Sequence, residues 1–432
     1  MVFSKTHLYC LHTSLRVSLF FIVLLFTTPL VCPVPSTTPA SLPGLEPSHV
    51  LIHNVSYVSQ ETEFFCAYAS MAMVFEFLGK NTTLNDVLYN AGIGYSLAHQ
   101  QTSLFPLAGY ILCQQPDNLN ALASMYGLNV SLWYNETPDA WQQYLMYVKQ
   151  NITNNTPVIT SVNPIQLPSF RGQFSLPQDV WDASGSFGHA IVIIGFNESN
   201  NTVCYQDPFA EVLGDKSLGD YTWMTTTELR NVINTTVGTK QLIISFTNTS
   251  KPYNASEAFQ KAQTRNRERL NGNSSVYEPE YATISGFSLG IKAVDSFQTQ
   301  FTRGDNNRIK TVFFYEFFGR LTKQYNKDML FVLLQNQIRP RTCLILFSTE
   351  HEFDRIALEK QYTAQYLLTK GDDAEASLFN KEAGLWENFS ACYDVFLKKG
   401  FMLSIPRALF LTIKMNTLLS DIETVEQAII DV

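Results

Sequence analysis

One stretch constrains the fold of this chain more than any other. Residues 64–79 read FFCAYASMAMVFEFLG, and Glu76 is their only charged residue. A helix that is apolar on every side belongs at the centre of a domain, where other elements cover it. Gly79 supplies a stop at its carboxyl end. The stretch therefore predicts a buried central helix with Cys66 near its start.

The segments that follow predict a mixture of helices and strands. The expected helices are 84–92, 117–126 and 138–151, and the expected strands are 128–133, 157–162, 189–196, 202–207 and 241–246. The polar turn NESNN between 189–196 and 202–207 favours a hairpin. Because helices come first and strands later, the pattern is typical of an α+β domain, which we place at 50–250.

The remainder of the chain predicts a second, mainly helical domain. Residues 251–280 are polar and are expected to form a linker with one exposed helix. From Tyr281 onward the pattern turns helical, so we expect the helical domain to span 281–432. Its expected elements are helices at 284–299, 308–324, 351–369, 373–399 and 406–430, with a short strand at 343–347.

The amino-terminal segment indicates export. Residues 1–32 combine a positive flank with an apolar run from Val17 to Phe26. This run is short for a membrane helix, which needs about 20 residues, and suits the core of a signal peptide. An uncleaved anchor that attaches the chain to the membrane is the alternative. Residues 33–49 are rich in Pro, Ser and Thr and predict an extended stalk. We expect a protein that is secreted or anchored at the outer face of the membrane.

Asparagines in Asn-x-Ser/Thr triplets support export. There are thirteen of them: Asn54, Asn81, Asn129, Asn135, Asn151, Asn154, Asn197, Asn200, Asn234, Asn248, Asn254, Asn273 and Asn388. This density predicts a glycoprotein. The alternative is a composition that is simply rich in Asn and Thr.

The cysteine count fits an oxidising compartment. Of seven cysteines, Cys10 and Cys32 lie in or beside the signal, which leaves five. An odd number leaves one free thiol. If that thiol is Cys66, the remaining cysteines can form two disulfide bonds, although the sequence does not determine the pairing. The pairs that stay within one domain are Cys113 with Cys204 and Cys343 with Cys392.

Charge and composition narrow the range of partners. The net charge of −8 argues against a nucleic-acid partner, which would need a basic face. No spacing typical of metal ligands is present, and we expect no cofactor. Arg303-Gly304-Asp305 is interpreted as a charged turn, and His99 and His351 as surface residues.

Three local signals carry chemistry. Cys66 follows Gln60 at the start of the buried helix, Gly188-His189 opens an apolar strand, and Asp207-Pro208 ends the next strand. A helix amino terminus and a nearby imidazolium both lower the pKa of a thiol. His189 can serve as base and acid, and Asp207 can hold its ring. The Gln60 amide and the Cys66 backbone N–H can stabilise an oxyanion.

Each residue also has a non-catalytic interpretation. Cys66 could be a small buried hydrophobic residue, and His189 a hydrogen-bonded core histidine. Asp207 before Pro208 could merely start a turn. Asp182 is an alternative partner for His189, but it lies in a Ser/Gly-rich loop. The spacing of Gln60 and the odd cysteine count favour catalysis.

The motifs QETEFFCAYAS, FGHAIVIIGF and YQDPFA resemble those of papain-like cysteine hydrolases, most closely the C39-like peptidase group. This resemblance covers about 50–250. It implies a papain-like α+β domain with Gln60 as oxyanion donor, Cys66 as nucleophile, His189 as base and Asp207 as its orienting partner. Many members have Gly after the nucleophile, whereas this chain has Ala67.

A second resemblance concerns the helical part. Its segments SGFSLGIKAVDSF and GLWENFSACYDVFLKKG look broadly similar to butirosin-biosynthesis H-type acyltransferases. These enzymes transfer an acyl group from a carrier protein, a donor that export disfavours. The expected function is therefore an exported cysteine peptidase or amidase that cleaves a peptide or amide substrate through an acyl-thioester. We expect 95–112 and 163–182 to rim its cleft. An inactive papain-like domain that only binds is the other alternative.

Overall fold

The computed structural model describes 48–62, 64–100, 106–112, 116–135, 137, 140–173, 188–236, 240–273, 276, 287–302, 352–399 and 405–432. Several sequence-based predictions lie outside these residues. They concern the signal, most of the stalk, the helix at 308–324, the strand at 343–347, Cys113, Cys343, Asp182, His351 and Arg303-Gly304-Asp305.

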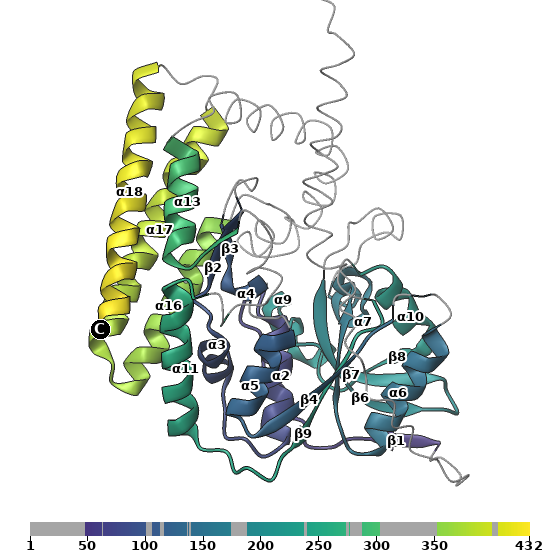
Figure 1. The fold of residues 1–432 in the computed structure, drawn as a ribbon. Coiled ribbons are helices and arrows are strands. Elements are labelled where there is room, and N and C mark those ends of the chain that lie inside the picture. Colours follow the sequence, from purple (N-terminus) through teal and green to yellow (C-terminus); the bar gives the residue numbers. More distant parts are fainter. Residues whose placement is uncertain are drawn as a thin grey trace, which may run out of the picture.

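A seven-stranded antiparallel sheet forms the centre of the first half (Figure 1). Its order is β4-β9-β5-β6-β7-β8, and β1 pairs with the carboxyl-terminal end of β6. The strands are β1 (His49–Leu51), β4 (Leu128–Trp133), β5 (Val158–Val162), β6 (His189–Asn197), β7 (Thr202–Gln206), β8 (Thr222–Thr225) and β9 (Ile243–Asn248). The predicted β6–β7 hairpin is confirmed by their antiparallel pairing, in which Asn197 lies opposite Thr202.

Helices cover both faces of this sheet, with α2 and α5 on one side and α6 and α10 on the other (Figure 1). They are α2 (Cys66–Phe77), α3 (Leu84–Ala91), α5 (Pro116–Met125), α6 (Trp141–Thr153) and α10 (Thr226–Asn234). The predicted central helix is α2, which packs on β5 and β6 and is buried from Tyr68 to Phe75. Short helical turns connect the elements: α4 (Gly109–Leu112), α7 (Pro168–Arg171), α9 (Ala210–Leu213), η2 (Pro164–Gln166) and η3 (Lys216–Leu218).

The described part of the second half is mainly helical, as predicted. Its helices are α11 (Ala255–Leu270), α13 (Ile291–Thr302), α16 (Glu352–Lys370), α17 (Asp373–Lys399) and α18 (Ile405–Asp431). α17 packs against both α16 and α18, around the buried side chains of Trp386, Phe389 and Leu419. Of the helices described, none has the length and apolar character that crossing a membrane requires. The architecture confirms the α+β class with a helical region that follows the sheet domain.

A small three-stranded sheet joins the two halves. β2 (Leu97–Gln100) lies between β3 (Leu107–Ala108) and β10 (Phe287–Leu289), so a strand from the second half pairs with one from the first. His99 lies opposite Ser288 in this sheet and is fully buried, with Nδ1 3.0 Å from the hydroxyl of Ser296. The expectation that His99 is a surface residue was wrong, because the strand that carries it is covered by the helical half.

The helix expected in the segment 251–280 is present as α11, but it is packed rather than exposed. Arg269 is buried, and its guanidinium donates to the Ala91 carbonyl and to the Asn118 side chain. Asn266 donates to the Tyr89 carbonyl over 2.8 Å. Tyr89 and Ala91 both belong to α3, and polar side chains that donate to such backbone carbonyls can be buried. The polar composition of 251–280 therefore did not indicate an exposed helix.

Neither expected disulfide pairing is shown: Cys204 and Cys392 are free thiols, and Cys113 and Cys343 lie outside the described residues. Cys204 is fully buried in the middle of β7, where it lies opposite Gly195 and Trp223 of the neighbouring strands. Burial, together with the charge of Asp220, raises the pKa of this thiol to about 12. Cys204 therefore packs as a small apolar side chain. Among the described residues, Cys66 is therefore not the only free thiol.

Candidate active site

Cys66 is the first residue of α2, the helix that crosses the centre of the sheet domain. Phe65 precedes it as the N-cap residue and makes no side-chain capping hydrogen bond. Cys66 thus lies at a helix amino terminus, where the free backbone amides and the helix dipole favour a thiolate. With 8% of its surface exposed, Cys66 lies just beneath the molecular surface rather than deep in the core.

His189 and Asp207 lie together because they occupy the ends of two paired strands. His189 opens β6, and Asp207 directly follows β7, which is antiparallel to β6. The Nε2 atom of His189 is 2.7 Å from Oδ1 of Asp207, and both side chains are almost completely buried. The ring also lies against Phe209, with 5.8 Å between ring centroids. The structure thus brings together two residues that are 18 positions apart.

The same histidine lies close enough to the Cys66 thiol to lower its pKa. Because Nε2 is engaged by Asp207, Nδ1 is the ring nitrogen left to face the thiol. The structure therefore connects Cys66, His189 and Asp207 in series, the order that a nucleophile, a base and its orienting group require.

Electrostatics favour an ion pair in this series. Burial opposes the charge on His189, but the charge and hydrogen bond of Asp207 outweigh it and raise the pKa of His189 from 6.5 to about 10. Burial also opposes a thiolate, yet the hydrogen bond and charge of His189 hold the pKa of Cys66 below its usual value. The pKa of Asp207 is likewise lowered, because His189 outweighs the effect of burial. The arrangement favours thiolate, imidazolium and carboxylate together.

Asp207 is itself held by a residue that the sequence did not reveal. Ser169 donates its hydroxyl to Oδ2 of Asp207 over 2.6 Å, and the Phe209 amide donates to Oδ1 over 2.9 Å. The Ser169 backbone amide donates in turn to the hydroxyl of Tyr205. Ser169 lies in α7, directly after Pro168, where the only sequence signal was a proline that suits a helix start. Nothing in that signal points toward Asp207.

Gln60 is buried, in a loop next to the same group of residues. Its backbone amide donates to the Pro208 carbonyl over 3.0 Å, which ties the loop to the Asp207-Pro208 turn. Its side-chain Nε2 donates to the Thr62 carbonyl over 2.5 Å. An amide nitrogen carries two N–H groups, so one remains for a further acceptor. The structure places Gln60 near the turn that carries Asp207, and its role as oxyanion donor stays a prediction.

Most of the residues expected to rim the cleft are buried where the structure describes them. Residues 95–99 were expected to rim the cleft, yet Tyr95, Leu97 and His99 are buried in the interior between the two halves. The described part of the other expected rim includes Ser169 and Phe170, which are also buried. The alternative orienting residue, Asp182, lies outside the described residues.

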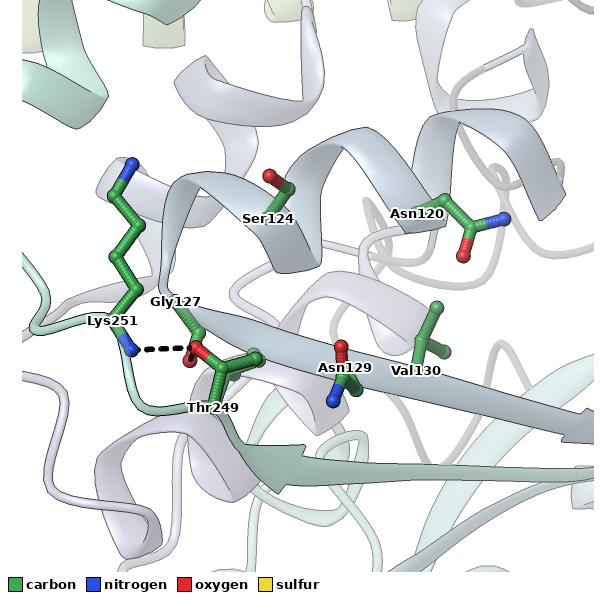
Figure 2. A pocket seen from close by; sticks show the side chains of 8 residues that line it. Asn120, Ser124, Gly127, Asn129, Val130, Thr249 and Lys251 are labelled. Carbon is green, nitrogen blue, oxygen red and sulfur yellow. Dashed lines mark hydrogen bonds between the residues drawn. The ribbon is translucent and has the colours of Figure 1, made fainter.

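A shallow hollow elsewhere on the surface lies between α5 and the ends of β4 and β9 (Figure 2). Its lining includes Asn120, Asn129, Thr249 and Lys251, and it contains none of Cys66, His189 and Asp207. Lys251, its one charged side chain, is paired with Glu257 at 3.1 Å. With no nucleophile and a neutralised cation, the hollow offers no chemistry comparable to that of the buried triad.

Comparison with known proteins supports the resemblance that the motifs suggested. The model of the Peptidase_C39 like family matches residues 52–236, a segment that contains Gln60, Cys66, His189 and Asp207. The recognition of a C39-like domain is thereby confirmed. The curated proteins contain no match to the chain.

Proposed function

We propose that this chain, which carries a C39-like peptidase domain at residues 52–236, is a cysteine hydrolase that cleaves peptide or other amide bonds. The family supports a cysteine hydrolase in general. The observation that carries the specific proposal is the buried series in which Cys66, at a helix amino terminus, lies beside His189, and His189 hydrogen-bonds Asp207. A domain that only binds would not need these three groups in contact.

The reaction begins from the thiolate and imidazolium pair. The sulfur of Cys66 attacks the carbonyl carbon, and the oxyanion that forms accepts hydrogen bonds from the Cys66 N–H and the Gln60 amide. The carbon–nitrogen bond then breaks, and His189 gives its proton to the departing nitrogen. The result is an acyl-thioester and a neutral imidazole.

Water completes the cycle. Neutral His189 takes a proton from water, whose oxygen attacks the thioester carbon, and the carbon–sulfur bond breaks. This step restores the thiolate and the imidazolium and releases the acid. Asp207 keeps the ring in the orientation that both steps need.

The function is tested with purified protein, a library of peptide and amide substrates, and a thiol-directed probe. We expect Cys66→Ala to abolish turnover and labelling without unfolding the domain. Gln60→Ala should lower turnover on the order of a hundredfold, the usual cost of one oxyanion donor. Full turnover by the Cys66→Ala variant would refute the assignment of the nucleophile.

We also propose that the protein is exported and glycosylated, and the exposure of the acceptor asparagines supports this. All thirteen lie in the described part of the chain, and none of them is buried. Asn135, Asn151 and Asn197 are partly buried, and the others are exposed. Treatment of the protein from its natural source with a peptide-N-glycosidase should lower its mass, and an unchanged mass would refute the proposal.

A further inference from the structure

Helix α16 of the helical half lies against the loop that precedes Cys66. The hydroxyl of Tyr362 donates to Oε2 of Glu61 over 2.9 Å, although the two residues are 301 positions apart. The Tyr362 ring also meets the Phe65 ring edge-on, with 5.1 Å between centroids and 88° between planes. One side chain of α16 therefore contacts both the residue after Gln60 and the residue before Cys66.

A second contact lies two turns earlier on the same helix. The guanidinium of Arg355 lies over the ring of Phe64, 5.5 Å from its centroid. Arg355 is held by the Tyr110 hydroxyl at 2.8 Å and by the Glu352 carboxylate at 3.1 Å. The two phenylalanines that lead into α2 are thus both packed against α16.

Helix α16 is itself firmly attached to the first half. The carboxylate of Glu359 accepts hydrogen bonds from the amides of Gly109 and Tyr110 at 3.0 and 2.6 Å. Thr363 donates to the Ile93 carbonyl over 2.7 Å. These buried bonds give α16 a defined position from which Tyr362 and Arg355 can hold the loop.

The loop has features that call for such support. Glu61 adopts a left-handed backbone conformation with a φ of 59°, which residues other than glycine rarely adopt. Phe65 caps α2 without a side-chain hydrogen bond. At its other end, the loop is tied by the Gln60 amide to the Pro208 carbonyl.

We propose that Tyr362 is a positioning residue that, through Glu61 and Phe65, fixes the two oxyanion donors on either side of them. The donors are the Gln60 side-chain amide and the Cys66 backbone N–H, so this inference rests on the proposed function. The helical half is then a part of the catalytic apparatus, and its contribution is made at the transition state. A shift of a fraction of an ångström in either donor weakens that contribution.

Two probes separate this role from a general effect on the thiol. Iodoacetamide alkylates a thiolate by displacement at carbon and creates no oxyanion. p-Nitrophenyl acetate acylates the same thiolate through a tetrahedral oxyanion, with release of p-nitrophenolate. A variant with misplaced oxyanion donors should lose acylation and keep alkylation.

The test compares Tyr362→Phe with Tyr366→Phe. Both substitutions remove one hydroxyl from α16, but that of Tyr366 donates to Asp86, away from the loop. We expect Tyr362→Phe to slow acylation on the order of tenfold, less than removal of a donor outright, while alkylation changes less than twofold. Tyr366→Phe should change neither rate. In a Gln60→Ala background, Tyr362→Phe should have a smaller effect than in the wild type, because one of the donors it positions is already missing.

Hydrogen exchange of the backbone amides at 60–66 provides a readout that does not depend on catalysis. Exchange should be faster in Tyr362→Phe and unchanged in Tyr366→Phe. If wild-type protein is alkylated but not acylated, the proposed function fails, and the exchange data alone decide whether Tyr362 holds the loop. Equal acylation by Tyr362→Phe and wild type, equal loss of both reactions, or unchanged exchange would each overturn the inference.

Discussion

The contact between Cys66 and His189 leads to a prediction about pH. The pKa of the thiol is lowered and that of His189 is raised to about 10, so the ion pair exists between these two values. The rate of iodoacetamide alkylation should follow a pKa below 9 in the wild type. In His189→Ala the stabilising partner is lost while burial continues to disfavour the thiolate, so the pKa should exceed 9.

The raised pKa of His189 also determines how the stability of the folded protein depends on pH. Because the pKa of His189 is higher in the folded protein, its contribution is fully present below its unfolded value near 6.5 and is lost as the pH rises through about 10. Alkylation profiles that coincide for wild type and His189→Ala would contradict the ion pair.

Ser169 allows a direct test of how the Asp207 carboxylate is held. Ser169→Ala removes the donor to Oδ2 of Asp207, and a hydrogen bond to a charged group contributes about 1.5–3 kcal/mol. The carboxylate should be less stable as an anion, so its pKa should rise and the pKa of His189 should fall from about 10. A titration of the imidazole by NMR measures this directly. Ser169→Thr, which keeps the hydroxyl, should restore the wild-type titration, and an unshifted pKa in Ser169→Ala would exclude the positioning role.

At the level of elements, substitutions in α11 test whether this segment is a packed helix or an exposed linker. Arg269→Met leaves the Ala91 carbonyl and the Asn118 side chain without their buried donor, and should lower the free energy of unfolding by about 2–4 kcal/mol. Denaturant unfolding measures the loss. Lys261→Met on the same helix removes only an exposed pair with Glu257 and should cause no measurable change. Equal stability of the two variants would mean that α11 contributes nothing to the core.

Elements with a strong local pattern could be predicted, and those that depend on tertiary pairing could not. β4 begins and ends where the alternation of LNVSLW predicts, and α2 follows from its apolar composition. β8 and α10 were missed, although Thr225 and Glu228 form a capping box whose sequence signature was present. The small sheet could not be predicted, because β2 and β3 are short and their partner β10 comes from the other half of the chain.

The candidate site divides in the same way. Cys66, His189 and Asp207 could be singled out from the sequence. Each lies at or next to the end of a predicted helix or strand, and their chemistry is recognisable from residue type. Ser169 contacts Asp207, and Tyr362 contacts Glu61, across 38 and 301 positions of the sequence. Only the folded chain brings such residues together.

For the whole molecule, the shared interior predicts cooperative unfolding. Tyr95 donates to Glu375 over 2.6 Å, and Leu97 and Ala108 pack into the same core as Trp386. The proposed division into domains at 50–250 and 281–432 therefore does not imply two independent folding units. Calorimetry should show one transition that includes both halves, and proteolysis should spare 255–270. Two well-separated transitions would contradict this expectation.

The attachment of α16 to the loop before Cys66 has a consequence for the order of events during synthesis. The ribosome releases the nucleophile and its histidine well before it releases Tyr362, which comes almost 300 residues after Cys66. Until then, the loop lacks the hydroxyl and the ring that contact it. If the proposed roles hold, a nascent chain carries Cys66 before its oxyanion donors are fixed in place. Under the proposed function, the chain would gain its full activity only after α16 has folded against the loop, which would delay attack on neighbouring chains during folding.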